Sequence, residues 1–150
     1  MSLDGFVVRN LVFELNNTIM ESKIDKIYQP EKDEIMLNLR SSSKNLQLLL
    51  SANSTYPRIN ITSGKYLNPT SPPSFCMFLR KHLSGGIIKK VKQINMDRVI
   101  MLEVASKNEL KSDTTRRIYI EIMGKHSNII LRRKKHSVGM YQKNQFEYQQ

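Results

Sequence analysis

The sequence predicts an α+β domain in which two main helices accompany an antiparallel β-sandwich or half-barrel. Two observations favour this class. Apolar residues recur at helical spacing in only two stretches, one near the N-terminus and one around residues 73–83. Elsewhere, short runs of alternating apolar and polar residues are separated by turn-forming residues, which is the pattern of antiparallel strands.

The first helix is expected over residues 4–20. Asp4 stands where an N-cap residue would, because its carboxylate can accept from the free N–H groups of the first turn. Leu11, Leu15 and Ile19 then recur at helical spacing with polar residues between them.

Strands follow in two groups. A meander of three strands is expected first, and a Pro-rich loop at residues 51–73, with room for one short strand, follows it. Residues 108–115 form a polar hairpin connection in the second group. The expected strands cover residues 23–29, 34–40, 46–50 and 58–61 in the first group, and 87–94, 99–105, 116–123 and 128–131 in the second.

The second helix is expected to begin at Pro72 or Pro73, since proline suits a first helical turn, and to run to Leu83. Gly85 would end it in the left-handed conformation that glycine adopts without strain. No internal repeat and no heptad is visible. A single domain over residues 1–131 is therefore expected.

The composition favours an anionic partner. Lys and Arg number 24 against 13 Asp and Glu, a formal net charge of +11. Residues 132–150 hold five Lys or Arg and one Glu, so most of this charge lies in the domain before them. Nucleic acid is the commonest partner of such a basic protein.

Cys76 is the only cysteine, so no intrachain disulfide can form and a reducing compartment is indicated. No signal-peptide pattern and no apolar run of about 20 residues is visible. We expect a cytoplasmic protein with no membrane partner.

Five separated blocks carry a resemblance to a known family. They resemble, in the same order, the N-terminal domain of the NFACT family, whose bacterial members are called RqcH or fibronectin-binding protein A and whose eukaryotic relative is NEMF. The blocks are Leu3-Asp4-Gly5, residues 23–30, Phe75-Cys76-Met77 with residues 80–83, Asp97-Arg98, and residues 121–131.

The resemblance implies a ribosome quality-control factor. Such a protein binds the large ribosomal subunit (rRNA) with its stalled peptidyl-tRNA, recruits alanyl-tRNA and supports template-independent tailing of the nascent chain. It also implies a non-enzymatic RNA-binding role without cofactors, and a fold similar to the N-terminal domain of formamidopyrimidine-DNA glycosylases. Those enzymes attack with an N-terminal proline, whereas this chain begins Met1-Ser2-Leu3, so base excision is not expected.

The resemblance assigns Asp4, Asp97 and Arg98 to tRNA binding. On the residues alone, Arg98 could contact a phosphate or a base edge in bidentate fashion, with Asp97 accepting from a base or a ribose hydroxyl. The structural alternative is a turn aspartate beside a surface arginine.

A basic run beside this pair is a candidate for phosphate contacts. Strand alternation places Lys90 and Lys92 on one face and Lys89 with Val91 on the other. Lysine-rich strands are also common as solvated faces or protected edges, so both readings stay open. The candidate residues are Arg80, Lys81, Lys89, Lys90 and Lys92.

No reactive or metal centre is expected. His82, His126 and His136 lack the spacing of metal ligands, and there is no second cysteine. Cys76 has Leu79 and Leu83 at helical spacing, so we expect it in the core, with His82 on the helix surface.

The tail, residues 132–150, lacks apolar periodicity, and the resemblance stops at Leu131. The chain from Leu131 can be back-translated so that a frame shifted by one base regains apolar patterning similar to the family's continuation. We therefore expect a poorly ordered tail that arises from a frameshift, which resequencing the gene would test. The alternatives to the RNA-binding function are a fibronectin-binding, adhesin-like protein and a glycosylase-like nuclease.

Overall fold

The computed structural model describes residues 5–42, 44–95, 97–107 and 113–133, and all structural statements refer to these. Asp4, and the predicted tail beyond Arg133, lie outside them. The elements in chain order are α1 (Gly5–Thr18), β1 (Lys23–Tyr28), β2 (Glu34–Arg40), β3 (Asn45–Ser51), β4 (Arg58–Thr62), α2 (Ser74–Leu83), β5 (Ile87–Gln93), β6 (Val99–Lys107), β7 (Asp113–Glu121), the 3-10 helix η1 (Gly124–His126) and β8 (Asn128–Arg133).

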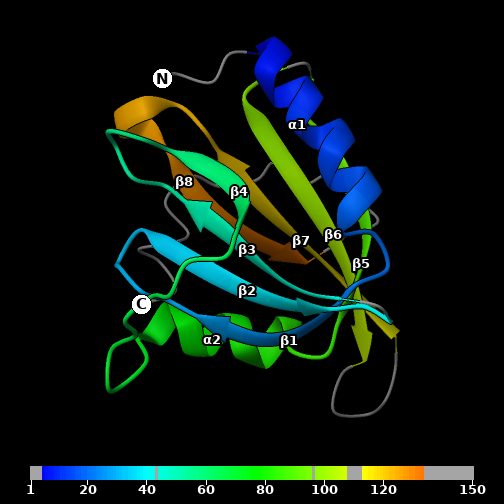
Figure 1. The fold of residues 1–150 in the computed structure, drawn as a ribbon, viewed down its shortest axis with the longest axis vertical. Coiled ribbons are helices and arrows are strands. Elements are labelled where there is room, and N and C mark those ends of the chain that lie inside the picture. Colours follow the sequence, from blue (N-terminus) through cyan, green and yellow to red (C-terminus); the bar gives the residue numbers. More distant parts are fainter. Residues whose placement is uncertain (1–4, 43, 96, 108–112, 134–150) are drawn as a thin grey trace.

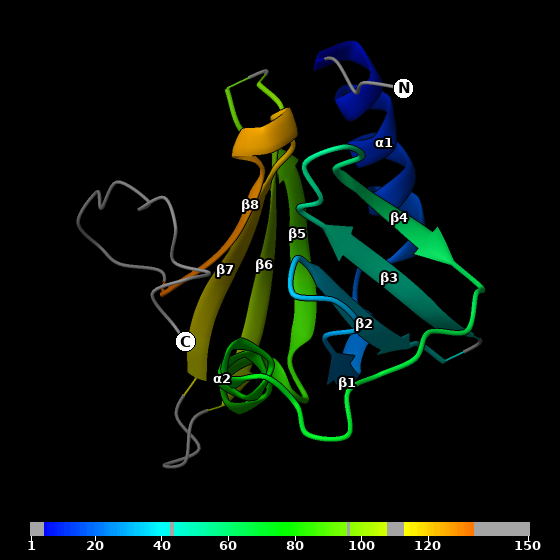
Figure 2. The same cartoon turned by 90° about the vertical axis from the view of Figure 1, so that its left-hand side faces the viewer.

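The strands form one open antiparallel sheet in the order β4-β3-β2-β1-β5-β6-β7-β8 (Figure 1). It consists of two four-stranded meanders, and the strand pairing between them is limited to Lys23 of β1 and Ile87 of β5. Figure 2 shows the two halves turned out of a common plane. The α+β class, the antiparallel strands and the two helices are thus confirmed, whereas the sheet does not close into a barrel.

One hydrophobic core unites both halves of the sheet. Strand alternation directs every second apolar side chain inward, as for Leu37 and Leu39 of β2 and Leu102 and Val104 of β6. These side chains belong to one connected buried cluster that also includes Phe75, Cys76, Leu79 and Leu83 of α2. The two meanders therefore stabilise each other through a shared interior.

Where the two halves of the sheet diverge, β1 and β5 have backbone groups that no strand pairs with, and the helices supply hydrogen-bond donors to them. On β5, the carbonyl of Val91 accepts a hydrogen bond of 3.0 Å from Asn16 Nδ2 of α1. On β1, the carbonyl of Ile27 accepts a bond of 2.8 Å from Arg80 Nε of α2. Each helix thus supplies a donor to a strand carbonyl beyond the single pair that joins β1 to β5.

These contacts reveal an internal repeat of one helix followed by four strands. Asn16 and Arg80 are 64 positions apart, and so are the carbonyls they bind, those of Ile27 and Val91. Each helix lies against the first strand of the other half, as expected of two units related by a twofold axis. The expectation that the chain contains no repeat is therefore wrong at the level of structure.

The two units share their irregular features too. Positive φ angles of 65° and 79° occur at Glu21 and Gly85, whose N–H groups donate to the carbonyls of Ile88 and Ile24. Both first strands carry a bulge at the same place, between Ile24 and Lys26 in β1 and between Ile88 and Lys90 in β5. Such features are usually specified by local structure, so their recurrence supports the repeat.

Two length changes conceal this repeat in the sequence. Register pairing relates Ile35 to Ile100, a spacing of 65, and Ile59 to Ile129, a spacing of 70. No fixed period therefore runs through the chain. The common element is the pattern of hydrogen bonds, which many apolar sequences can satisfy.

The predicted element positions hold closely. The second helix ends before Gly85, whose φ of 79° is the expected left-handed conformation. The last strand, predicted to start over residues 128–131, runs to Arg133, and β7 begins at Asp113 within the predicted connection. Within the described residues, no helix is long and apolar enough to cross a membrane.

Candidate functional site

Asp97 and Arg98 lie in the turn between β5 and β6. Ile94 donates to the carbonyl of Val99 at 2.9 Å, which closes the turn, and Asp97 donates from its N–H to the carbonyl of Ile94 at 2.9 Å. Asp97 Oδ1 accepts from the Arg98 N–H at 2.8 Å. The aspartate thus has the local turn role considered from the sequence, while its side chain stays exposed.

Three elements hold the backbone of this turn in place. Gln93 Nε2 of β5 donates to the carbonyl of Asp97 at 2.8 Å and to that of Gly5 in α1 at 3.1 Å. The N–H of Ile122, just after β7, donates to the carbonyl of Arg98 at 2.8 Å. The turn is therefore fixed beside the start of α1, and Gly5 directly follows Asp4 in the chain.

The guanidinium of Arg98 is exposed, and within the described part of the chain no hydrogen bond or ion pair engages it. A fixed backbone that presents a free guanidinium can bind a phosphate or a base edge without first breaking a contact. Among the predicted contact sites, this turn is the best preorganised for binding an anion.

A buried acid that the sequence reasoning missed lies next to the turn. Glu121, at the end of β7, pairs in register with Val99 and Asn128 and is only 1% exposed. Its Oε2 atom and the Nδ2 atom of Asn128 have no hydrogen-bond partner among the described residues. Alternation gave no signal for this, because Glu121 continues the row of Arg117 and Tyr119, whereas Ile118 and Ile120 point to the other face of the strand.

The basic run of β5 is only partly available for phosphate. Lys89 Nζ lies 2.8 Å from Glu21 Oε2, and Lys90 Nζ lies 3.9 Å from Glu103 Oε2. The expectation that Lys89 shares a face with Val91 is wrong, because the bulge between Ile88 and Lys90 leaves Lys89 exposed while Val91 is buried. Lys92 and Lys81 are also exposed.

Arg80 has a structural role. Besides its bond to the carbonyl of Ile27, its guanidinium lies 5.6 Å from the ring centroid of Tyr28, within the range of a cation–π contact. The side chain therefore joins α2 to β1 rather than projecting freely from the helix.

The other singled-out side chains also have clear surroundings. Cys76 is fully buried, which confirms the predicted core position, and burial raises the pKa of its thiol above the ordinary value. His82 packs edge-on against the Phe78 ring, with centroids 4.6 Å apart. In the described segments, no three His, Cys, Asp or Glu side chains are placed to hold a metal ion.

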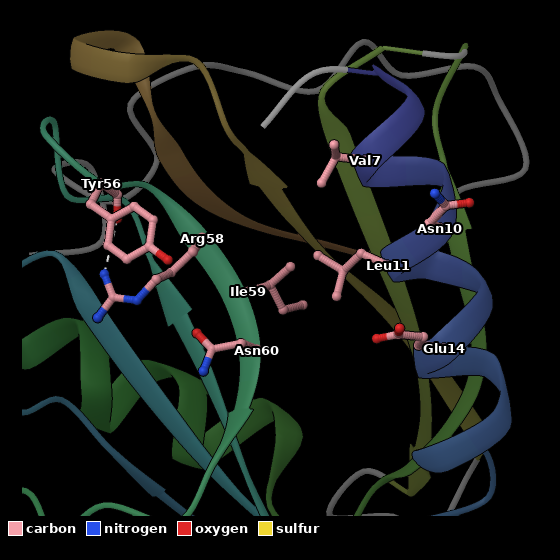
Figure 3. A pocket seen from close by; sticks show the side chains of 8 residues that line it. All are labelled: Val7, Asn10, Leu11, Glu14, Tyr56, Arg58, Ile59 and Asn60. Carbon is pink, nitrogen blue, oxygen red and sulfur yellow. Dashed lines mark hydrogen bonds between the residues drawn. The ribbon is translucent and has the colours of Figure 1, made fainter. Parts of the chain in front are cut away.

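A groove with a volume of about 430 Å³ separates α1 from β4 (Figure 3). Leu11 and Glu14 point from the helix into this space, and Ile59 and Asn60 lie across it. Val7, Asn10, Tyr56 and Arg58 complete the lining. Arg58 is held in place, because it donates to the carbonyl of Tyr56 at 2.9 Å and lies 3.7 Å from Glu34.

The repeat shows why this groove exists. In the second half, the positions equivalent to Leu11 and Glu14 are Phe75 and Phe78, whose rings lie 6.4 Å apart, and Phe75 is fully buried against the core. The second half thus uses its own phenyl rings at the positions where the first half leaves an open space. Carboxylate and amide groups above an apolar floor suit a flat group that donates hydrogen bonds.

Comparison with known proteins places the chain among relatives. Residues 4–142 match the family model described as NFACT N-terminal and middle domains. The Rqc2 homolog RqcH of Bacillus subtilis is 47% identical over 131 residues, which are 87% of this chain and 23% of the relative. The chain thus spans about a quarter of the length of that relative.

Two solved structures share the fold. The N-terminal part of the fibronectin/fibrinogen-binding protein from Streptococcus suis superposes with a TM-score of 0.86 at 41% identity, covering 89% of this chain and 50% of that one. The N-terminal domain of the fibronectin-binding protein PavA from Streptococcus pneumoniae gives a TM-score of 0.85 at 40% identity, covering 87% and 49%.

Proposed function

This chain belongs to the NFACT family, and we propose that it is the tRNA-contacting N-terminal segment of an RqcH-like ribosome quality-control factor. In this role it binds tRNA on the large ribosomal subunit in the cytoplasm and supports template-independent tailing of stalled chains with alanine. Peptide-bond formation belongs to the ribosome, so the segment itself is a binding module.

The observation that carries the proposal is the Asp97-Arg98 turn. Hydrogen bonds from the Gln93 side chain and the Ile122 N–H fix its backbone, yet both of its charged side chains face solvent. Arg98 contacts a phosphate or base edge, and the free carboxylate oxygen of Asp97 accepts from a ribose hydroxyl. Asp4, which precedes Gly5 in the chain, contributes to the same tRNA contact.

The net charge of +11 supports the same partner. Lys81, Lys89, Lys90 and Lys92 add phosphate contacts that strengthen binding without selecting a sequence. Among these, Lys92 has no carboxylate partner within the described residues, whereas Lys89 must first leave Glu21.

Binding of deacylated tRNA across a range of salt concentrations tests this function. The variants are Asp97→Ala and Arg98→Ala, with Arg40→Ala as a control that removes an exposed arginine from β2. We expect wild type and the control to bind with a steep salt dependence, and the two turn variants to lose about tenfold or more in affinity, or on the order of 1–3 kcal/mol. Equal binding by all four proteins would contradict the proposal.

Fibronectin binding is a second candidate function, because two relatives with the same fold are named for it. Immobilised fibronectin can be presented to the same four proteins. Strong fibronectin binding together with absent tRNA binding would favour this alternative over the first.

A further inference from the structure

Three cationic side chains from three elements meet at the other end of the β5–β8 half from the Asp97-Arg98 turn. Arg116 of β7 is directly cross-strand paired with Arg133 of β8, and its Nη2 atom lies 3.4 Å from Nδ1 of His82 in α2. Lys81 adjoins His82 on the helix. We call Arg116, Arg133 and His82 the cationic cluster.

The cationic cluster has no balancing acid within the described chain. Arg116 is 9% exposed, and the one hydrogen-bond partner found for it there is the His82 ring. On the opposite face of the same strand, by contrast, Arg117 is satisfied by Glu103 at 3.1 Å. Like charges directly across a strand pair are destabilising, and a buried cation without a counter-charge is costly to fold.

The pKa directions agree with this picture. Burial first, and then Arg116, Lys81 and Arg133, lower the pKa of His82 below its ordinary value. Burial and Arg133 lower the pKa of Arg116 as well. The groups that face His82 from its own helix, from β7 and from β8 are thus all positive.

The repeat shows that the fold does not require these charges. By the register, the counterparts of His82 and Arg116 in the first half are Thr18 and Leu46, and Ser63 corresponds to Arg133. Leu46 packs against the core in the same scaffold. The cations are therefore an addition to the second half rather than a consequence of its topology.

We propose that the cationic cluster is a phosphate-binding site that takes a phosphate group of the RNA backbone. Arg116 and Arg133 provide two guanidinium groups for the phosphate oxygens, and His82 adds a ring N–H and, once it is protonated, a further positive charge. That the phosphate comes from RNA, which we call the RNA source, rests on the proposed function, whereas binding of a phosphate group as such does not. Along the strands, the cationic cluster lies roughly 17 Å from the Asp97-Arg98 turn, so one RNA can occupy both.

The phosphate chemistry is tested with inorganic phosphate and the histidine NMR signals. The pH titration of His82 is recorded in chloride and in phosphate at equal ionic strength, for wild type and for Arg133→Ser. We expect phosphate to raise the pKa of His82 in wild type and to raise it less in Arg133→Ser. An unchanged His82 titration would overturn the site, whatever tRNA does.

The RNA source is tested by tRNA binding. Arg133→Ser and Arg116→Leu introduce the residues of the first half, and Arg40→Ser controls for the lost charge. We expect each cluster variant to lower the salt slope of binding by about 1 and the control to leave it unchanged. Arg133 is exposed, so its variant keeps the test valid if Arg116→Leu does not fold.

The outcomes separate the two proposals. A phosphate-sensitive His82 with unchanged tRNA binding in both cluster variants would refute the RNA source and assign the site to free phosphate. If wild type does not bind tRNA at all, the proposed function and the RNA source fail together, while the His82 titration still decides whether the cationic cluster binds phosphate.

Discussion

Gly86 lies at the contact between the two halves of the molecule. Its carbonyl accepts from the Ile24 N–H at 2.8 Å, which joins β1 to the start of β5. A Cβ atom at this position would lie 2.4 Å from Val104 Cγ1 and 3.1 Å from the carbonyl oxygen of Leu83. Gly86→Ala is therefore expected to destabilise the fold by overpacking rather than by backbone strain.

The size of the effect follows from the neighbours. Val104 is fully buried and β-branched, so it cannot rotate away, and the other close atom belongs to the backbone. Overpacking of a tight core costs about 1–3 kcal/mol, and the lower entropy of an unfolded alanine returns about 0.4–1 kcal/mol. We expect a net loss of about 1–2 kcal/mol, or a Tm lower by roughly 3–8 °C.

Urea and thermal unfolding of wild type and four variants measure this. Gly64→Ala is the matched control, because its nearest contact would be an ordinary 3.4 Å from the Tyr66 ring, and it should remain within about 0.5 kcal/mol of wild type. Val104→Ala combined with Gly86→Ala should cost at least about 1 kcal/mol less than the sum of the single changes. Additive changes, or equal stability of the two glycine variants, would refute the steric argument.

Three further predictions concern conformation and titration. Glu21→Gly should raise the unfolding free energy by up to about 1 kcal/mol, because Glu21 has a φ of 65° where its counterpart in the second half is Gly85. A lower unfolding free energy of this variant in urea would show that the ion pair with Lys89 matters more. The pKa of His82 is lowered in the folded protein, so the unfolded chain binds more protons and stability should fall as the pH drops below about 6.5. His82→Gln should reduce this pH dependence of stability, and an identical pH dependence of both proteins would contradict the prediction. Cys76 is buried with a raised thiol pKa, so a thiol reagent should modify it slowly at neutral pH until urea unfolds the chain; fast labelling of the native protein would argue against the core position.

Much of the architecture was predictable because local signals and tertiary packing agree. The Leu15 and Ile19 spacing, the glycine stop at residue 85 and the alternation through Leu37 and Leu39 all correspond to observed elements. The β5 bulge was not predictable, since it adds one residue to a strand whose apolar pattern looks regular. That bulge decides which lysines are exposed.

The candidate site was only partly visible in the sequence. Asp97 and Arg98 stand together in the chain, but the bonds from Gln93 and Ile122 that fix their turn come from different strands or strand ends. The cationic cluster was hidden for the same reason, because Arg116 and His82 are 34 positions apart and meet only when α2 packs beside β7.

The exchange of helices between the two halves has a consequence for how the molecule unfolds. Neither half can protect the open edge of its own first strand, since Asn16 serves Val91 and Arg80 serves Ile27. The two halves are therefore arranged like the subunits of a dimer that exchange their helices, joined here in one chain. Separating the halves would expose both strand edges and the shared core at once. We therefore expect the domain to unfold as one cooperative unit, even though only Lys23 and Ile87 pair between the two meanders.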